Sequence, residues 1–126
     1  MKTINRISNF IIFNTKTVTK NTNVTSEKID LRSIAANGVF SLQYLITGDG
    51  VVKFEYLLSN EDLATTMIEP STATDIGSSL SKTTGLGGDG KDILPFEPEI
   101  ARWLQIKCTE TGTASTAVVT AWLAIQ

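Results

Sequence analysis

Hydrophobic and polar side chains alternate through the last 26 residues of the chain, 101–126. Because successive side chains of a β-strand point to opposite faces, this period of two predicts two long strands, each with one face on a core. The predicted core positions are Leu104, Ile106, Cys108, Ala117, Val119, Ala121, Leu123 and Ile125. A turn over 110–115 folds these strands into a hairpin and places Trp103 directly opposite Trp122 on the other face. Two paired tryptophans on a polar face predict a surface that something else covers.

A second alternation runs over residues 39–59 and is interrupted only by Gly48-Asp49-Gly50. A three-residue loop with glycine where a positive φ is needed is a common β-hairpin connection. The predicted hairpin pairs Tyr44 with Phe54 and turns every large side chain of both strands to one face. It is expected to supply much of the core.

Shorter strands are predicted at four further places. These are 28–34, 65–69, 74–80 and 92–96. The last is expected at a sheet edge, because Pro95 and Pro98 cannot donate ladder hydrogen bonds. Residues 1–27 are rich in Asn, Thr and Lys and predict an extended N-terminal arm with a limited contribution to the core, either lying along a neighbour or forming a poorly packed edge. The whole pattern predicts an all-β protein with a single β-sandwich of jelly-roll type over residues 28–126.

Length and charge narrow the function classes. A chain of 126 residues fits one domain, and 41% hydrophobic with 19% charged residues are globular values. The net charge is −2 and no basic block is present, which argues against a nucleic-acid partner. The longest N-terminal apolar run, 10–13, is too short for a signal peptide or a membrane helix, so no membrane partner is expected.

Little in the sequence supports catalysis. The chain has no histidine, so a Ser-His or Cys-His nucleophile is excluded. The single cysteine, Cys108, has no partner for a disulfide or a zinc site and is expected to be a small buried residue. The neighbouring carboxylates Glu61-Asp62 and Glu97-Pro98-Glu99 are interpreted as solvated turns. We therefore expect no enzymatic activity and no cofactor.

The glycine-rich segment 82–91 invites two ligand hypotheses. Its glycines follow no predicted strand and open no helix, which argues against a dinucleotide site. Residues 87–95 match a calcium-binding nonapeptide once, but that site is built between stacked repeats. No metal is therefore expected, although the sequence leaves open whether the loop from Gly87 to Asp92 holds an ion.

The candidate contact residues are the large apolar side chains outside the predicted core, together with one arginine. They are Trp103, Trp122, Arg102, Phe10, Ile12 and Phe13. Tryptophan and arginine are enriched at the centres of protein interfaces, which favours a partner-binding role. The two tryptophans could alternatively form a sugar-stacking platform, or a patch covered by the chain's own residues 1–27 or 60–91.

Several segments between residues 28 and 126 carry a resemblance to known proteins. The segments are Ile29-Asp30-Leu31-Arg32, Thr47-Gly48-Asp49-Gly50, Phe54-Glu55-Tyr56, Thr74-Asp75-Ile76, 92–99, 102–107, Glu110-Thr111-Gly112 and 121–126. In combination they resemble small phage and prophage virion structural proteins whose genes lie among head and tail genes. The resemblance implies a β-sandwich on a virus particle in many copies, and it transfers no catalytic residue.

The expected function is therefore that of a non-enzymatic virion protein that decorates or cements a phage capsid through protein–protein contacts. Its expected partners are the major capsid protein or other virion proteins, with further copies of itself in a homo-oligomer. We expect it on the particle surface, after a period in the host cytoplasm before assembly. The alternative is a β-sandwich module of a tail, neck or fibre, including one that binds carbohydrate.

Overall fold

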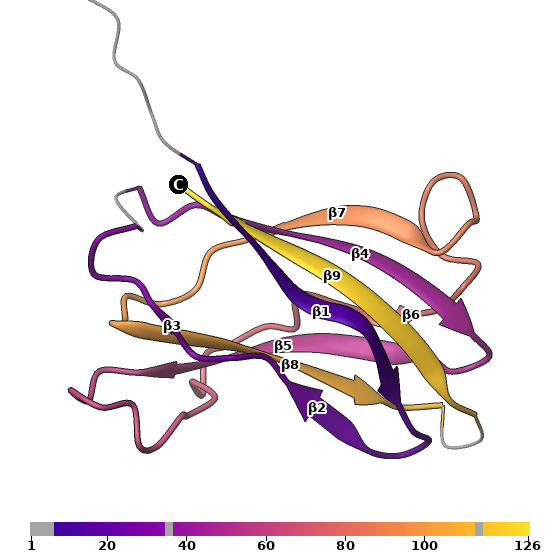
Figure 1. Cartoon of the computed structure of the whole chain (residues 1–126), viewed down its shortest axis with the longest axis horizontal. Helices are drawn as coiled ribbons and strands as arrows, with labels where there is room; N and C mark the ends of the chain where they lie inside the picture. Colours follow the sequence, from indigo (N-terminus) through magenta and orange to yellow (C-terminus); the bar gives the residue numbers. More distant parts are fainter. Residues whose placement is uncertain (1–6, 35–36, 113–114) are drawn as a thin grey trace, which may run out of the picture.

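The computed structural model describes residues 7–34, 37–112 and 115–126 (Figure 1). These residues contain nine β-strands and no helix. The strands are β1 (Ser8–Val18), β2 (Asn23–Thr25), β3 (Ile29–Asp30), β4 (Phe40–Gly48), β5 (Val52–Ser59), β6 (Gly77–Leu80), β7 (Lys91–Phe96), β8 (Trp103–Glu110) and β9 (Ala117–Ile125). Within these described ranges, no helix is long and apolar enough to cross a membrane.

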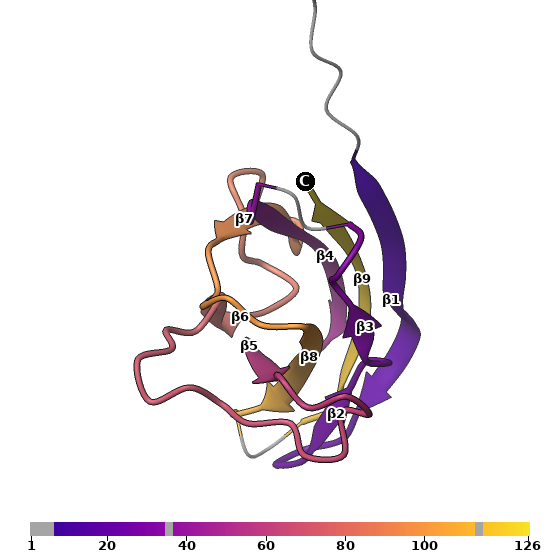
Figure 2. The same cartoon turned by 90° about the vertical axis from the view of Figure 1, so that its left-hand side faces the viewer.

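The strands form two antiparallel sheets that face each other across one core (Figure 2). Sheet A has the order β1-β9-β4-β7, and sheet B has the order β2-β8-β5-β6, with β3 also paired to β8. The chain crosses repeatedly between the sheets: β4 and β5 lie in different sheets, as do β8 and β9, whereas β5 and β6 are neighbours in sheet B. Eight strands connected in this way form a jelly roll, which confirms the predicted all-β sandwich.

Both predicted hairpins are wrong in their pairing. β4 pairs with β9 and β7, whereas β5 pairs with β8 and β6. The turn predicted at 48–50 exists, but it carries the chain from one sheet to the other. Gly48 has a φ of 83°, and a Cβ added to Gly50 would lie 2.6 Å from the backbone nitrogen of Ala117. The glycines are therefore needed because the turn packs directly against the start of β9.

The faces of the strands are predicted correctly even where the partners are not. Every second residue of β4, β5, β8 and β9 is buried, including all eight core positions assigned to residues 101–126. Tyr44 and Phe54, expected side by side in a hairpin, instead meet across the core with ring centroids 5.8 Å apart. The same alternation suits both arrangements, because it specifies a core side and not a neighbouring strand.

The described part of the predicted arm, 7–27, supplies two strands of the sandwich. β1 pairs with β9 along its length, and β2 pairs with β8. Phe13 and Val18 are buried in the core, so this segment contributes more than the expected limited share. The pairing of β1 has register shifts on either side of Phe13, and such bulges blur the period-two signal that the sequence analysis relied on.

The shorter strands agree in part with expectation. β7 is the edge strand of sheet A, as its prolines predict. The strand expected over 28–34 is limited to the two residues of β3, and the one expected over 65–69 is a single bridge between Leu58 and Ile68. Residues 82–90 form the loop before β7, and β6 occupies only the end of the 74–80 segment.

A buried carboxylate ties three loops together at one end of the sandwich. Glu110, only 1% exposed, accepts hydrogen bonds from the backbone N–H groups of Asn21, Val51 and Gly112 at 3.0, 3.0 and 2.7 Å. These donors belong to the turns that follow β1, β4 and β8. The sequence pattern places Glu110 at the start of a turn and gives no sign of this role.

Candidate functional site

The outer face of sheet A is an uncovered surface among the described residues. Neither Figure 1 nor Figure 2 shows a described segment laid across the side of this sheet that is turned away from sheet B. The register places the following side chains of β9, β4 and β7 on it: Val118, Thr120, Trp122, Ala124, Ser41, Gln43, Leu45, Thr47, Lys91, Ile93 and Pro95. Lys91 is the only charged member of this set. These three strands of sheet A therefore present a nearly uncharged face with a substantial apolar share.

One row of side chains crosses all four strands of this face. Ile11 of β1 lies opposite Trp122, Trp122 lies opposite Gln43, and Gln43 lies opposite Ile93 of β7. The two ends of the row are well exposed, with Ile11 at 51% and Ile93 at 58% of their full accessible area. Between them lie the half-buried Trp122 and the polar, exposed Gln43. Exposed isoleucines on either side of a tryptophan suit a contact surface.

The predicted tryptophan pair does not exist. Trp103 is on β8 in sheet B, beside Asp30 and Ser59, whereas Trp122 is on β9 in sheet A. Both side chains do point away from the core, as the alternation predicts. Because β8 and β9 lie in different sheets, the two outward faces are on opposite sides of the sandwich, and the rings cannot form one platform.

Trp103 is partly covered by the chain itself. Its indole Nε1–H donates a hydrogen bond of 2.9 Å to the carbonyl oxygen of Glu61, and the Arg102 guanidinium lies 5.3 Å from the ring centroid. Arg102 in turn contacts Asp62 at 3.1 Å and Asp30 at 3.7 Å. Glu61, from the 60–91 segment, thus covers part of Trp103, as one of the alternatives had it, and Arg102 is engaged within its own chain.

The apolar residues of β1 are divided between the core and a groove. Phe13 is 3% exposed and is part of the core, so its side chain is not at the surface. Phe10 and Ile12 are half-buried and line a groove of about 600 Å³ together with Ile29 and Ile34. The groove lies between β1 and β3, at the open side of the sandwich.

We expect Trp103→Ser to cost about 1–2 kcal/mol more stability than Trp122→Ser, because only Trp103 loses a hydrogen bond and a cation–π contact within the chain. Urea unfolding of the two single variants measures the difference. Equal losses, or a larger loss for Trp122→Ser, would contradict the assignment of Trp122 to an open face.

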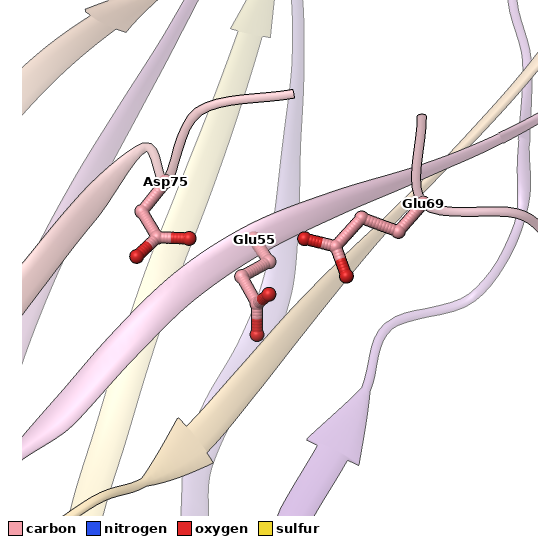
Figure 3. A group of neighbouring side chains, drawn as sticks. All are labelled: Glu55, Glu69 and Asp75. Carbon is pink, nitrogen blue, oxygen red and sulfur yellow. The ribbon is translucent and has the colours of Figure 1, made fainter. Parts of the chain in front are cut away.

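Three carboxylates converge on the outer side of sheet B (Figure 3). One oxygen of each of Glu55, Glu69 and Asp75 lies within 4.8 Å of the others, the only such group of three among the described residues that could hold a metal. Glu55 is only 6% exposed, and Lys53 Nζ lies 3.5 Å from its Oε1. Lys107 faces Glu55 across the β5–β8 ladder. Two lysines therefore balance much of the negative charge, which favours an ion-pair cluster with a shared proton over a divalent cation site.

The pKa of Glu69 is raised, first by a hydrogen bond shared with Glu55 and then by burial and by the Glu55 charge, while Lys107 and Lys53 act in the opposite direction. A raised pKa means that the folded chain holds this proton after the unfolded chain has lost it. The resulting stabilisation is complete below the ordinary value of 4.5 and is lost as the pH rises through the folded pKa.

The wild type is therefore expected to lose stability as the pH rises above 4.5. In Glu69→Gln, which has no proton to lose at this position, that decrease should be absent. Urea unfolding between acid and neutral pH tests this. Glu99→Gln is the control of opposite sign: hydrogen bonds donated by Tyr56 and Thr72 lower the pKa of Glu99, so its contribution is lost as the pH falls. Identical pH profiles for wild type and Glu69→Gln would rule out the shared proton.

The other sequence candidates have simple structural roles. Burial raises the pKa of the Cys108 thiol to about 12, which confirms a small buried residue without thiolate character at neutral pH. Glu61 accepts a hydrogen bond from the nearby backbone N–H of Thr66, whereas Glu99 accepts hydrogen bonds from the distant hydroxyls of Tyr56 and Thr72. Residues 87–92 contribute to no group of three metal-ligating side chains in the described ranges.

Comparison with known proteins gives a likeness of fold. No protein family and no curated protein sequence matches the chain. Among solved structures, the VP2 subviral particle of infectious bursal disease virus superposes with a TM-score of 0.50 and 12% identity, covering 96% of this chain and 32% of that one. The Gt strain of the same virus gives a TM-score of 0.47 at 12% identity, over 95% of this chain and 32% of the virus protein. This chain thus spans about a third of those viral proteins and shares with the VP2 subviral particle a β-sandwich fold.

Proposed function

We propose that this chain is a non-enzymatic structural protein of a virus particle, and that it decorates the shell of a phage head and holds neighbouring shell subunits together. The outer face of sheet A carries the proposal. Trp122 lies at its centre, and Lys91 is the one charge on β9, β4 and β7. Covering such a face with another protein removes apolar area from water, which is favourable.

The shared fold supports the proposal by analogy. The solved structure with which this chain shares its fold is that of a subviral particle, VP2 of infectious bursal disease virus. A fold hosts many functions, so the analogy adds weight only because the surface of this chain also suits protein contacts.

The mechanism would be adhesive and repetitive. Each copy buries apolar area on its neighbours, from the outer face of sheet A and from the groove that Phe10 and Ile12 line. A weak contact becomes a stable layer when it is repeated by the symmetry of a particle. Before assembly the chain would stay in the host cytoplasm.

The alternative is a protein of the tail or neck. It differs from a shell decoration protein mainly in the number of copies per particle. Carbohydrate binding by a two-tryptophan platform has lost its geometric basis, because Trp103 and Trp122 lie on different sheets. No contact in the described residues favours it over protein binding.

Quantitative mass spectrometry of gradient-purified particles from the source tests the proposal. The measurement is the number of copies of this chain per major shell subunit. A ratio near one, or a simple fraction of it, supports shell decoration. A handful of copies per particle would move the chain to the neck or tail, and its absence from particles would reject the virion role.

A further inference from the structure

We infer that the outer face of sheet A binds the same face of a second copy of this chain, so that two sandwiches stack about a two-fold axis. The inference deepens the proposed function by naming the molecule that covers this face. It rests on the proposed function only for the location of the dimer on a virus particle, because the stacking is argued from the surface alone. The groove between β1 and β3, which Ile11 also lines, is otherwise left free for a shell protein.

The distribution of charge favours a copy of the same chain. In an isologous contact the same patch meets itself, so charges near the axis meet like charges and repel. On β9, β4 and β7 the outer face of sheet A has Lys91 alone, on the edge strand and outside the central row. The outer side of sheet B, with Lys53, Glu55 and Lys107, could not stack on itself in this way.

The cross-strand row is self-complementary. A two-fold axis parallel to the strands, midway between β9 and β4, exchanges β9 with β4 and β1 with β7. It lays Ile11 over Ile93 of the second copy and Trp122 over Gln43 of the second copy. The exposed isoleucines at both ends of the row are thereby covered by each other. Stacked sheets pack about 10 Å apart, which the side chains of such rows fill.

The centre of the row also gains a polar contact. Within the described ranges, the indole N–H of Trp122 has no hydrogen-bond acceptor, in contrast to that of Trp103. The side-chain amide of Gln43 is exposed and offers an oxygen acceptor. Stacking places this acceptor over the indole, so the dimer satisfies a donor that the single chain leaves to solvent.

Sedimentation velocity of the full chain over a dilution series tests the inference. We expect a concentration-dependent dimer. Ile93→Glu, which buries a charge in the stacked face, should weaken the dimer at least about 10-fold in Kd. Ile100→Glu is the matched control: Ile100 is fully exposed in the loop before β8, outside sheet A, and its substitution should leave Kd unchanged. Thermal unfolding of both variants verifies that each remains folded.

Cross-linking tests the direction of the axis. Ile11→Cys and Ile93→Cys are mixed and treated with a short bis-maleimide, while the native Cys108 is buried and does not compete. Cross-links between the two different variants are expected, with few within either variant alone. Cross-links confined to identical variants would overturn the proposed axis.

A chain that stays monomeric at every concentration, or a dimer unaffected by Ile93→Glu, overturns the inference. A monomer that is nevertheless found in particles by mass spectrometry would overturn the self-contact and leave the proposed function standing.

Discussion

Replacing Glu110 with alanine is expected to lower the free energy of unfolding by about 3–5 kcal/mol. The carboxylate is 1% exposed and accepts hydrogen bonds from three backbone N–H groups, those of Asn21, Val51 and Gly112. Its removal takes away the acceptor that all three donors share and leaves a gap where a buried side chain was. The turns that follow β1, β4 and β8 lose their common anchor at the same time.

Urea unfolding at neutral pH measures this loss. Glu97→Ala is the matched control, because Glu97 is exposed in the loop after β7 and its truncation should change stability by less than about 0.5 kcal/mol. Glu110→Gln should fall between the two, since an amide keeps the shape but has one acceptor oxygen fewer. A loss for Glu110→Ala no larger than that of the control would show that the three donors find other acceptors readily.

Phe54→Ala is expected to cost about 3–5 kcal/mol, the usual range for truncating a buried aromatic ring. Phe54 of β5 is 0% exposed, and its ring is 5.8 Å from that of Tyr44 in the opposite sheet. The substitution opens a cavity between the two sheets and removes one of the contacts that hold them together.

Thermal or urea unfolding with Leu86→Ala as control measures the effect. Leu86 is fully exposed in the loop before β7, so the same kind of truncation there should be nearly neutral. If the two variants lost equal stability, Phe54 would not be part of the packed layer between the sheets.

The candidate site was only partly predictable. The outward direction of Trp122 follows from the alternation in β9, whereas its contact with a partner stays a prediction. Its neighbours Ile11, Gln43 and Ile93 were not anticipated, because the row exists only through the pairing of four strands that are far apart in the chain. Trp103 has the same sequence pattern, yet the loop carrying Glu61 covers it.

The sequence by itself determined the all-β class, the core-facing residues of β4, β5, β8 and β9, the buried Cys108 and the edge position of β7. These depend on the period of two and on proline chemistry, which are local properties. Only the tertiary structure decided which strands pair, that β1 completes sheet A, and that Glu110 joins three turns. Strands far apart in the chain have the same alternation, so the alternation cannot show which of them pair. In this jelly roll the turn at 48–50 and the segment after Glu110 each cross to the other sheet, where a local reading of the chain predicts hairpins and a tryptophan pair.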